Sequence, residues 1–312
     1  MRVYIAGING MVGTALARIG RSLGYEVLGD SSKDLDLRDR TRVMSRLKSL
    51  SPDALIVAAG RVGGIKANSL FPVEFLSHNL QIQTNLLDSA HEVNIDRLLY
   101  LGSSCVYPKL SQQPISEDSL LTGSLEITNE AYALAKIAGI KLTQAYRNQY
   151  GRDWICAIPT NVFGPKDNFD IQEAHVISAM ITKFETAKAN NIKSVEFWGD
   201  GTPLREFIYV DDLARACYYL LNVYSDSAHI NIGTNFELTI LELSKIVAKA
   251  VTYSGKITFN ENLPNGAPRK LLDSRKIKSL GWKPEIQMED GLALTYQWFL
   301  NNSMRPNQME SH

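Results

Sequence analysis

The chain has 312 residues, 45% of them hydrophobic and 21% charged, and its 33 Lys and Arg residues balance its 33 Asp and Glu residues. This composition is typical of a soluble globular protein, and the balanced charge gives no reason to expect a nucleic acid or an anionic membrane as a partner. The three cysteines are odd in number and widely spaced, which fits neither a disulfide framework nor a zinc site and favours the reducing cytoplasm. No apolar run approaches the roughly 20 residues that span a bilayer.

The first half of the chain alternates strand-like and helix-like segments. The strand-like segments are apolar almost throughout, whereas the segments between them have helical spacing. Such an alternation predicts an α/β fold with a doubly wound parallel sheet of the Rossmann type, covered by helices on both faces. The predicted strands are residues 2–7, 25–30, 53–60 and 97–104, and the predicted helices are residues 11–24, 38–50, 72–94 and 129–142.

The second half is less regular, and no linker separates it from the first. We therefore expect its last segments to pack beside the sheet as a smaller substrate lobe, with a cleft at the carboxyl ends of the strands. The predicted dinucleotide-binding domain comprises residues 1–164 and 208–236, and the substrate lobe comprises residues 165–207 and 237–312. Within these ranges, the predicted elements are a strand that runs into a loop at 154–165, helices at 175–191 and 239–251, and a strand followed by a helix at 205–224.

Three glycines lie between the first predicted strand and the first predicted helix. Gly7, Gly10 and Gly13 have the spacing G-x-x-G-x-x-G. The first permits a tight turn, the second lets backbone N–H groups approach a pyrophosphate, and the third lets the helix lie close to the sheet. Because a helix N-terminus also favours negative charge, this loop predicts a dinucleotide site.

The end of the second predicted strand bears on which dinucleotide binds. Asp30 stands about 20 residues after the glycine loop, where an acidic residue usually holds the ribose hydroxyls and favours NAD. Lys33 and Arg38 follow and could instead hold a 2′-phosphate, and Asp30 could also simply cap a turn. The choice between NADPH and NADH stays open at this point.

A tyrosine and a lysine have the spacing of a reductase pair. Tyr132 and Lys136 are four residues apart in a helical segment and therefore share a face. An ammonium and an oxidised nicotinamide nearby can lower the pKa of a tyrosine from its usual value near 10. Tyr132 can then give a proton to a carbonyl oxygen while hydride reaches the carbon. With the glycine loop and the strand-end hydroxyls of Ser103 and Ser104, the pair indicates a short-chain dehydrogenase/reductase of the extended, sugar-nucleotide kind.

Five separated stretches, in order, make the resemblance more specific. They are "LGSSCVYPK", "TNEAYALAKIAGIK", "PTNVFGPKDNF", "WGDGTPLREFIYVDD" and "PRKLLDSRKIKSLGW". Together they resemble the GDP-L-fucose synthase family, over nearly the whole chain. The resemblance implies a cytoplasmic homodimer that takes GDP-4-keto-6-deoxy-D-mannose, inverts C3 and C5 through enol intermediates, and then reduces C4 with NADPH.

The resemblance also implies roles for five side chains. Ser103, Tyr132 and Lys136 match the reductase triad, and Cys105 and His175 match the base and the acid of epimerisation. Inversion next to a ketone needs a base on one face and an acid on the other. Thiol and imidazole groups exchange protons near neutral pH without a metal, and no metal is expected.

Binding residues follow from the same resemblance. Trp198 and Arg205 match positions that hold the sugar nucleotide, and a guanidinium fork suits a diphosphate. Lys183 stands where the family usually has arginine, and Asp273 is a further candidate, although its basic stretch could equally be a solvated face. The cofactor positions comprise the loop residues Asn9, Met11 and Val12 besides the glycines, the strand-end residues Leu101, Gly102, Ser103 and Ser104, and Lys136, Pro159, Thr160, Asn161, Val162 and His175.

Departures from the family pattern keep alternatives open. The family usually has basic residues where Asn9 and Ser32 stand, and their absence beside Asp30 makes NADH an alternative to NADPH. The stretch before His175 and Ser178 also departs from the family, so another GDP-4-keto sugar, of colitose or 6-deoxy-heptose type, is an alternative substrate. A non-catalytic nucleotide-sensing Rossmann protein is the alternative from another class.

Overall fold

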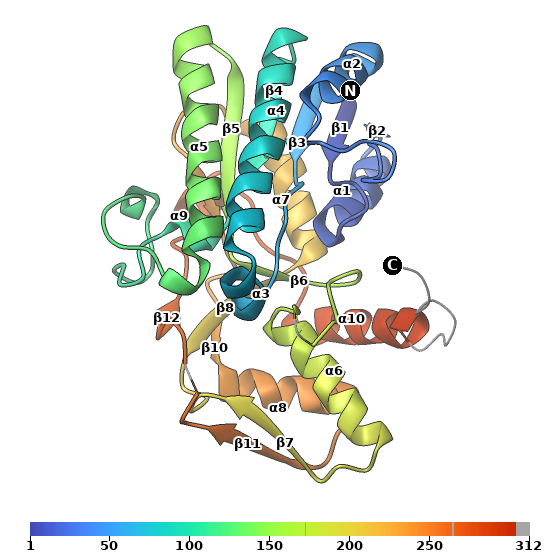
Figure 1. The fold of residues 1–312 in the computed structure, drawn as a ribbon, viewed down its shortest axis with the longest axis vertical. Helices are drawn as coiled ribbons and strands as arrows, with labels where there is room; N and C mark the ends of the chain where they lie inside the picture. The colour runs from blue at the N-terminus through green and yellow to red at the C-terminus, as the bar shows by residue number, and fades with distance from the viewer. Residues whose placement is uncertain (172, 264, 304–312) are drawn as a thin grey trace.

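A computed structural model describes residues 1–171, 173–263 and 265–303 (Figure 1). Its central feature is a six-stranded sheet with the order β2-β1-β3-β4-β5-β9, in which all neighbours are parallel. The predicted doubly wound sheet is therefore confirmed. Its strands are β1 (Arg2–Ala6), β2 (Glu26–Leu28), β3 (Ala54–Val57), β4 (Arg97–Leu101), β5 (Asp153–Pro159) and β9 (Ile230–Ile232).

Helices cover both faces of this sheet. One face carries α1 (Met11–Ser22) and α7 (Val210–Val223), which pack on each other. The other carries α2 (Arg40–Leu50), α4 (Asn79–Glu92) and α5 (Glu130–Tyr150), side by side (Figure 1). The predicted helix at 72–94 is interrupted, since a π-helical turn, Glu74–His78, precedes α4. A short helix, α3 (Ile65–Leu70), comes before that turn.

The remaining elements form a smaller lobe below the carboxyl ends of the strands (Figure 1). Strand β8 (Leu204–Tyr209) pairs with β6 (Asn161–Phe163), β10 (Glu237–Thr239) and β12 (Arg269–Lys270), so the predicted strand at 205–209 lies outside the central sheet. A second pair joins β7 (Ser194–Trp198) to β11 (Lys256–Asn260). The helices of this part are α6 (Val176–Ala189), α8 (Ile240–Val251) and α10 (Met288–Ser303), whereas the short α9 (Arg275–Ser279) packs against β9 of the central sheet. None of the helices within the described ranges is long and apolar enough to cross a membrane.

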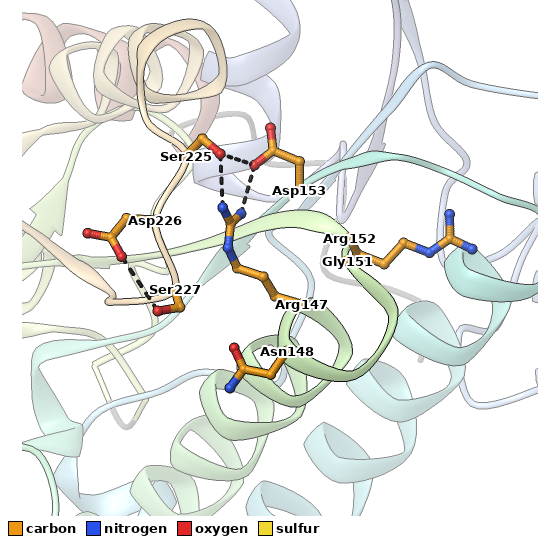
Figure 2. Close-up of a pocket in the computed structure, with 8 residues that line it drawn as sticks. All are labelled: Arg147, Asn148, Gly151, Arg152, Asp153, Ser225, Asp226 and Ser227. Atoms are coloured by element: carbon orange, nitrogen blue, oxygen red, sulfur yellow. Dashed lines mark hydrogen bonds and ion pairs between the residues drawn. The ribbon is translucent and has the colours of Figure 1, made fainter.

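The amino-terminal edge of the sheet, at the opposite end from the lobe, has a polar hollow of about 530 Å³ (Figure 2). Arg147 lines it and is 2.7 Å from Asp153 at the start of β5. Its other terminal nitrogen donates to Ser225 at 2.9 Å. Because the guanidinium is already paired, we read this hollow as part of the scaffold rather than as an anion site.

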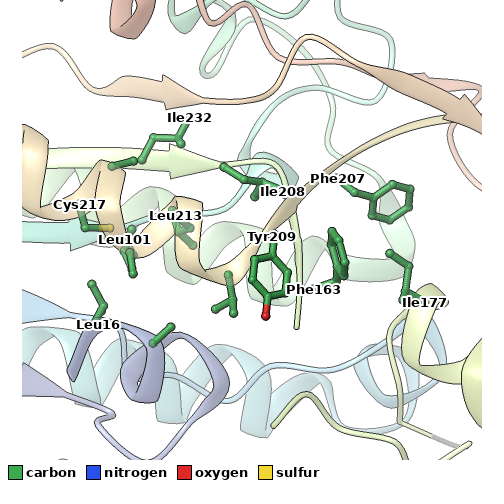
Figure 3. Packing of buried hydrophobic residues seen from close by; sticks show 14 of the residues in the cluster. Leu16, Leu101, Phe163, Ile177, Phe207, Ile208, Tyr209, Leu213, Cys217 and Ile232 are labelled. Atoms are coloured by element: carbon green, nitrogen blue, oxygen red, sulfur yellow. The ribbon is translucent and has the colours of Figure 1, made fainter. Parts of the chain in front are cut away.

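One apolar core runs from the central sheet into the lobe (Figure 3). Successive residues of a strand point to opposite faces, so Val3 and Ile5 of β1 join the cluster under α1 and α7, while Tyr4 packs into the cluster under α4 and α5. The first cluster continues through Phe163 on β6 to Ile177 on α6. This continuity explains why the sequence contains no linker between its halves.

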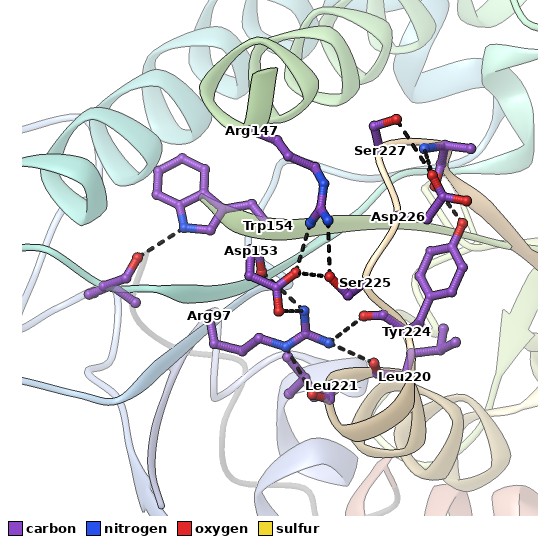
Figure 4. A network of polar contacts seen from close by, with 12 residues as sticks. Arg97, Arg147, Asp153, Trp154, Leu220, Leu221, Tyr224, Ser225, Asp226 and Ser227 are labelled. Atoms are coloured by element: carbon purple, nitrogen blue, oxygen red, sulfur yellow. Dashed lines mark hydrogen bonds and ion pairs between the residues drawn. The ribbon is translucent and has the colours of Figure 1, made fainter. Parts of the chain in front are cut away.

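A largely buried arginine, with 14% of its side chain exposed, joins α7 to the start of the sheet (Figure 4). Arg97, at the beginning of β4, donates to the carbonyls of Leu220, Leu221 and Tyr224 at 2.6–2.9 Å. Its Nη1 also lies 2.7 Å from the Asp153 carboxylate. A cation at a helix C-terminus satisfies the last carbonyls and opposes their partial negative charge.

We predict that Arg97→Ala lowers the free energy of unfolding by about 2–4 kcal/mol, because it leaves buried carbonyls without donors. Urea unfolding followed by circular dichroism measures this. The control is Arg40→Ala, since Arg40 is exposed and lies 3.8 Å from its acidic neighbours, and loss of such a pair costs less than about 1 kcal/mol. Equal effects of the two substitutions would contradict the role given to Arg97.

Candidate active site

The glycine loop forms a tight cradle where the strand order reverses. Gly7 has φ +86°, and a Cβ there would lie 2.8 Å from the Cα of Ala59, which follows β3. A Cβ on Gly13 would lie 1.9 Å from the carbonyl oxygen of Gly7. No side chain caps the first turn of α1, which begins directly after Gly10. The loop therefore fits the diphosphate of a dinucleotide, since side-chain-free backbone and a helix N-terminus face the crevice between β1 and β3.

The residues at the end of β2 are arranged differently from the sequence expectation. Asp30 does not cap a turn with its side chain, because its carboxylate forms a two-pronged ion pair with Arg46 of α2 and accepts a hydrogen bond from the Tyr4 hydroxyl. Burial alone would raise the pKa of Asp30, but these hydrogen bonds outweigh it and lower the pKa below its usual value. The Arg38 Nη2 forms an ion pair with the Asp36 Oδ2 at 2.7 Å, whereas Lys33 is exposed.

The reductase residues meet where β4 ends against α5. Ser103 follows the strand, and its hydroxyl accepts a hydrogen bond from the backbone N–H of Cys105 and is also hydrogen-bonded to Tyr132. The buried Lys136 Nζ donates to the carbonyl of Leu101 at 2.8 Å and lies 6.0 Å from the centre of the Tyr132 ring. The structure therefore brings Ser103, Cys105, Tyr132 and Lys136 together.

The protonation states of the pair differ from the sequence expectation. Burial raises the pKa of Tyr132, the charge of Cys105 raises it further, and the hydrogen bond from Ser103 opposes both. Lys136 is not among the groups that lower it. Burial lowers the pKa of Lys136 to about 8, so most of it is still an ammonium at pH 7. Tyr132 thus carries its proton at neutral pH, as a proton donor must.

Two side chains near Cys105 were missed by sequence reasoning. The Asn129 amide donates to the Cys105 Sγ at 3.2 Å, and the Lys270 ammonium lies 3.7 Å from the same sulfur. The charge of Arg205 also interacts with that of Cys105. Donors and positive charge stabilise a thiolate over a thiol. Lys270 lies in one of the stretches that carried the resemblance, but no local pattern connects it to Cys105.

His175 occupies the N-cap of α6 and is exposed. The preceding segment is held beside the loop after β3, because the Gly64 N–H donates to the carbonyl of Glu173 at 2.9 Å. Asp167, in the segment before α6, accepts hydrogen bonds from the Ser178 hydroxyl and from the Asn168 N–H. Burial raises the pKa of Asp167, and the charge of His175 opposes that rise. Among the described residues, no hydrogen bond joins His175 to Cys105.

The predicted sugar-nucleotide residues lie in the lobe, and one of them, Asp273, is already bound by another side chain. Arg205 is on β8, where burial lowers its pKa, Trp198 at the end of β7 is 55% exposed, and the Lys183 Nζ donates to the carbonyl of Glu196 at 3.2 Å. The carboxylate of Asp273 is instead bound by Arg275 at 2.5–3.0 Å. The geometry therefore does not favour Asp273 as a substrate ligand.

Among the remaining predicted cofactor positions, two side chains are already engaged within the protein. The side chains of Thr160 and Asn161 donate to the carbonyl of Glu206 at 3.1 and 2.7 Å, and Gly102 is buried between β4 and β5. In the described ranges, no group of three or more His, Cys, Asp and Glu side chains is placed to hold a metal ion.

Comparisons with known proteins agree on one kind of enzyme. Residues 3–233 match the family described as NAD dependent epimerase/dehydratase. The chain is 48% identical over 302 residues to GDP-L-fucose synthase 1 of Arabidopsis thaliana, covering 96% of this chain and 94% of that protein. It is 46% identical over 314 residues to GDP-L-fucose synthase of Escherichia coli strain K12, covering 97% and 98%. It is 41% identical over 304 residues to GDP-L-colitose synthase of Yersinia pseudotuberculosis, covering 96% and 98%.

Solved structures give the same picture. A GDP-L-fucose synthetase of Naegleria fowleri bound to NADP superposes with a TM-score of 0.89 at 26% identity, covering 97% of this chain and 94% of that one. A GDP-6-OMe-4-keto-L-xylo-heptose reductase of Campylobacter jejuni superposes with a TM-score of 0.90 at 31% identity, covering 96% and 97%.

We predict that Lys270→Ala slows alkylation of Cys105 by iodoacetamide severalfold, because an ammonium 3.7 Å from the reacting sulfur is lost. Mass spectrometry of the modified chain reports the rate at Cys105, since Cys156 and Cys217 are buried. Lys141→Ala, which removes an exposed lysine of α5, is the control. An alkylation rate that Lys270→Ala leaves unaltered would show that this ammonium does not act on the thiol.

Proposed function

We propose that the chain converts GDP-4-keto-6-deoxy-D-mannose to GDP-L-fucose. The chain belongs to the GDP-L-fucose synthase family within the NAD dependent epimerases/dehydratases. It inverts C3 and C5 and then reduces C4 with NADPH. The observation that carries the proposal is the meeting of Ser103, Cys105, Tyr132 and Lys136 where β4 ends against α5, beside the glycine loop. A nucleotide sensor would have no use for this complete set of groups.

Epimerisation follows from the surroundings of Cys105. The thiolate, supported by Asn129 and Lys270, removes the proton from the carbon next to the ketone. The electron pair moves to the ketone oxygen, where the hydroxyls of Ser103 and Tyr132 donate to the developing negative charge. His175 then returns a proton to the opposite face of the carbon, which inverts its configuration.

Reduction uses the same ketone oxygen. NADPH supplies the hydride when bound. Tyr132 gives its proton to the oxygen at C4, and Ser103 holds that oxygen by a hydrogen bond. The buried Lys136 ammonium is held by the Leu101 carbonyl, with its Nζ 6.0 Å from the centre of the Tyr132 ring, so it adds positive charge to the pocket in which the tyrosinate forms.

NADPH and the sugar nucleotide are assigned to different parts of the molecule. We propose that residues 1–164 and 208–236 hold NADPH through the glycine loop and the backbone after β4 and β5. Residues 165–207 and 237–312 then hold the sugar nucleotide through Trp198, Lys183 and Arg205, whose guanidinium fork suits the diphosphate. We also propose a cytoplasmic homodimer joined through α4 and α5. An exposed Leu134 on the outer face of α5, 45% accessible, supports this arrangement.

We predict that the two chemistries separate in deuterium oxide. Cys105→Ser should greatly slow deuterium incorporation at C3 and C5 while NADPH still binds. Tyr132→Phe should stop reduction while exchange continues, because its missing hydroxyl is the proton donor to C4. NMR of the nucleotide sugar measures exchange, and absorbance at 340 nm measures reduction. Full exchange by Cys105→Ser, or near-normal reduction by Tyr132→Phe, would reject the corresponding role.

We predict that GDP-4-keto-6-deoxy-D-mannose is turned over with a higher kcat/KM than the 3-deoxy keto sugar of the colitose type or a 4-keto-heptose. The substrates must be compared because Ser178, three residues after His175, donates a hydrogen bond to the Asp167 carboxylate beside the start of α6. Chromatography of the products from each GDP-keto sugar, under identical conditions, decides between them. A preference for either of the other two sugars would replace the proposed substrate and leave the chemistry unchanged.

A further inference from the structure

The pair formed by Asp30 and Arg46 bears on how the chain reads the 2′ position of its cofactor. Asp30 follows β2, the neighbour of β1, and a Cβ on the preceding Gly29 would lie 2.8 Å from the Cβ of Ile8 in the glycine loop. In folds of this type, that position faces the adenosine ribose. Asn9 of the glycine loop and Ser32, two residues after Asp30, are both uncharged.

The carboxylate of Asp30 has no free acceptor position. Its Oδ1 accepts from the Arg46 Nε at 3.1 Å and Nη2 at 2.8 Å, and its Oδ2 accepts from the same Nε at 3.0 Å and from the Tyr4 hydroxyl at 2.9 Å. A carboxylate offers about four acceptor sites. A ribose hydroxyl would therefore have to displace one of these donors, and the Asp30 charge is already balanced.

The partners of Asp30 differ in how firmly they are held. Tyr4 is 1% exposed in the centre of the sheet, and the side chain of Asp30 is 12% exposed, whereas that of Arg46 is 43% exposed. The Arg46 Nη1 has no hydrogen-bond partner within the described ranges, and Lys33 nearby is exposed. A guanidinium with a free edge beside the ribose position is suited to a phosphate.

We propose that Arg46 and Asp30 together decide whether this chain prefers a 2′-phosphate or a 2′-hydroxyl on the adenosine ribose. Arg46 binds the 2′-phosphate of NADPH and neutralises the charge of Asp30. Asp30 opposes the phosphate, and it accepts a hydrogen bond from a 2′-hydroxyl when Arg46 is absent. Arg46 thus supplies the positive charge that neither Asn9 nor Ser32 provides. The inference rests on the proposed function only for the identity of the cofactor.

The test measures binding of two probes that lack a nicotinamide. The affinities of adenosine 2′,5′-bisphosphate and adenosine 5′-monophosphate are determined by calorimetry for the wild type, Arg46→Ala and Asp30→Asn. The measured quantity is the ratio of the two affinities. Arg46→Ala should lower the preference for the 2′-phosphate at least tenfold, since it removes a cation and leaves Asp30 unpaired. Asp30→Asn should raise the preference, since it removes the opposing charge.

Controls separate this effect from a loss of folding or of general charge. Lys48→Ala removes an exposed cation from the same helix and should leave the ratio unchanged, and thermal unfolding checks each variant. An unchanged ratio in Arg46→Ala, an equal weakening of both probes, or shifts of the same sign in both variants would each overturn the proposal. Because neither probe takes part in turnover, failure here would leave the deuterium exchange at C3 and C5, and therefore the proposed function, untouched.

Discussion

A single buried carboxylate, that of Glu206, forms hydrogen bonds with both parts of the molecule. Glu206 of β8 is 0% exposed, and it accepts the N–H groups of Thr234 and Asn235, just after β9, at 2.6 and 2.7 Å, and that of Leu272, just after β12, at 3.0 Å. An unpaired charge buried in this way would be strongly destabilising. Docking of the lobe on the sheet therefore brings the N–H groups of Thr234 and Asn235 to this carboxylate, while Leu272 of the lobe itself supplies the third donor.

That docking determines the surroundings of Cys105. Arg205 precedes Glu206, and Lys270 lies two residues before Leu272, so the bonds of Glu206 place both cations on the side of the lobe that faces the end of β4. Parallel strands deliver their following loops to one edge of a sheet. The thiol, the hydroxyls and the buried ammonium consequently share one site, and one ketone oxygen can be stabilised in both epimerisation and reduction.

The structure gathers four of the predicted catalytic residues where β4 ends against α5, but their electrostatics differ from what the sequence led us to expect. The i, i+4 spacing correctly placed Tyr132 beside Lys136 on one helix face, yet the Lys136 ammonium is directed to the Leu101 carbonyl. Asp273 was a reasonable candidate for substrate binding, but Arg275, two residues later, occupies its carboxylate. Ionisation depends on burial and on every neighbouring group, and a spacing rule contains neither.

The sequence by itself determined what depends on local geometry. The alternation of apolar strands and helices predicts the doubly wound sheet, the glycine spacing predicts the phosphate loop, and a strand end predicts the position of Ser103 and Cys105, because steric limits and residue periodicity act within a few residues. Only the tertiary structure decided which distant side chains meet. Lys270 reaches Cys105 across 165 residues, and Arg46 reaches Asp30 from another element. Such long-range contacts depend on how helices and strands pack against one another. Local sequence patterns do not reveal that packing.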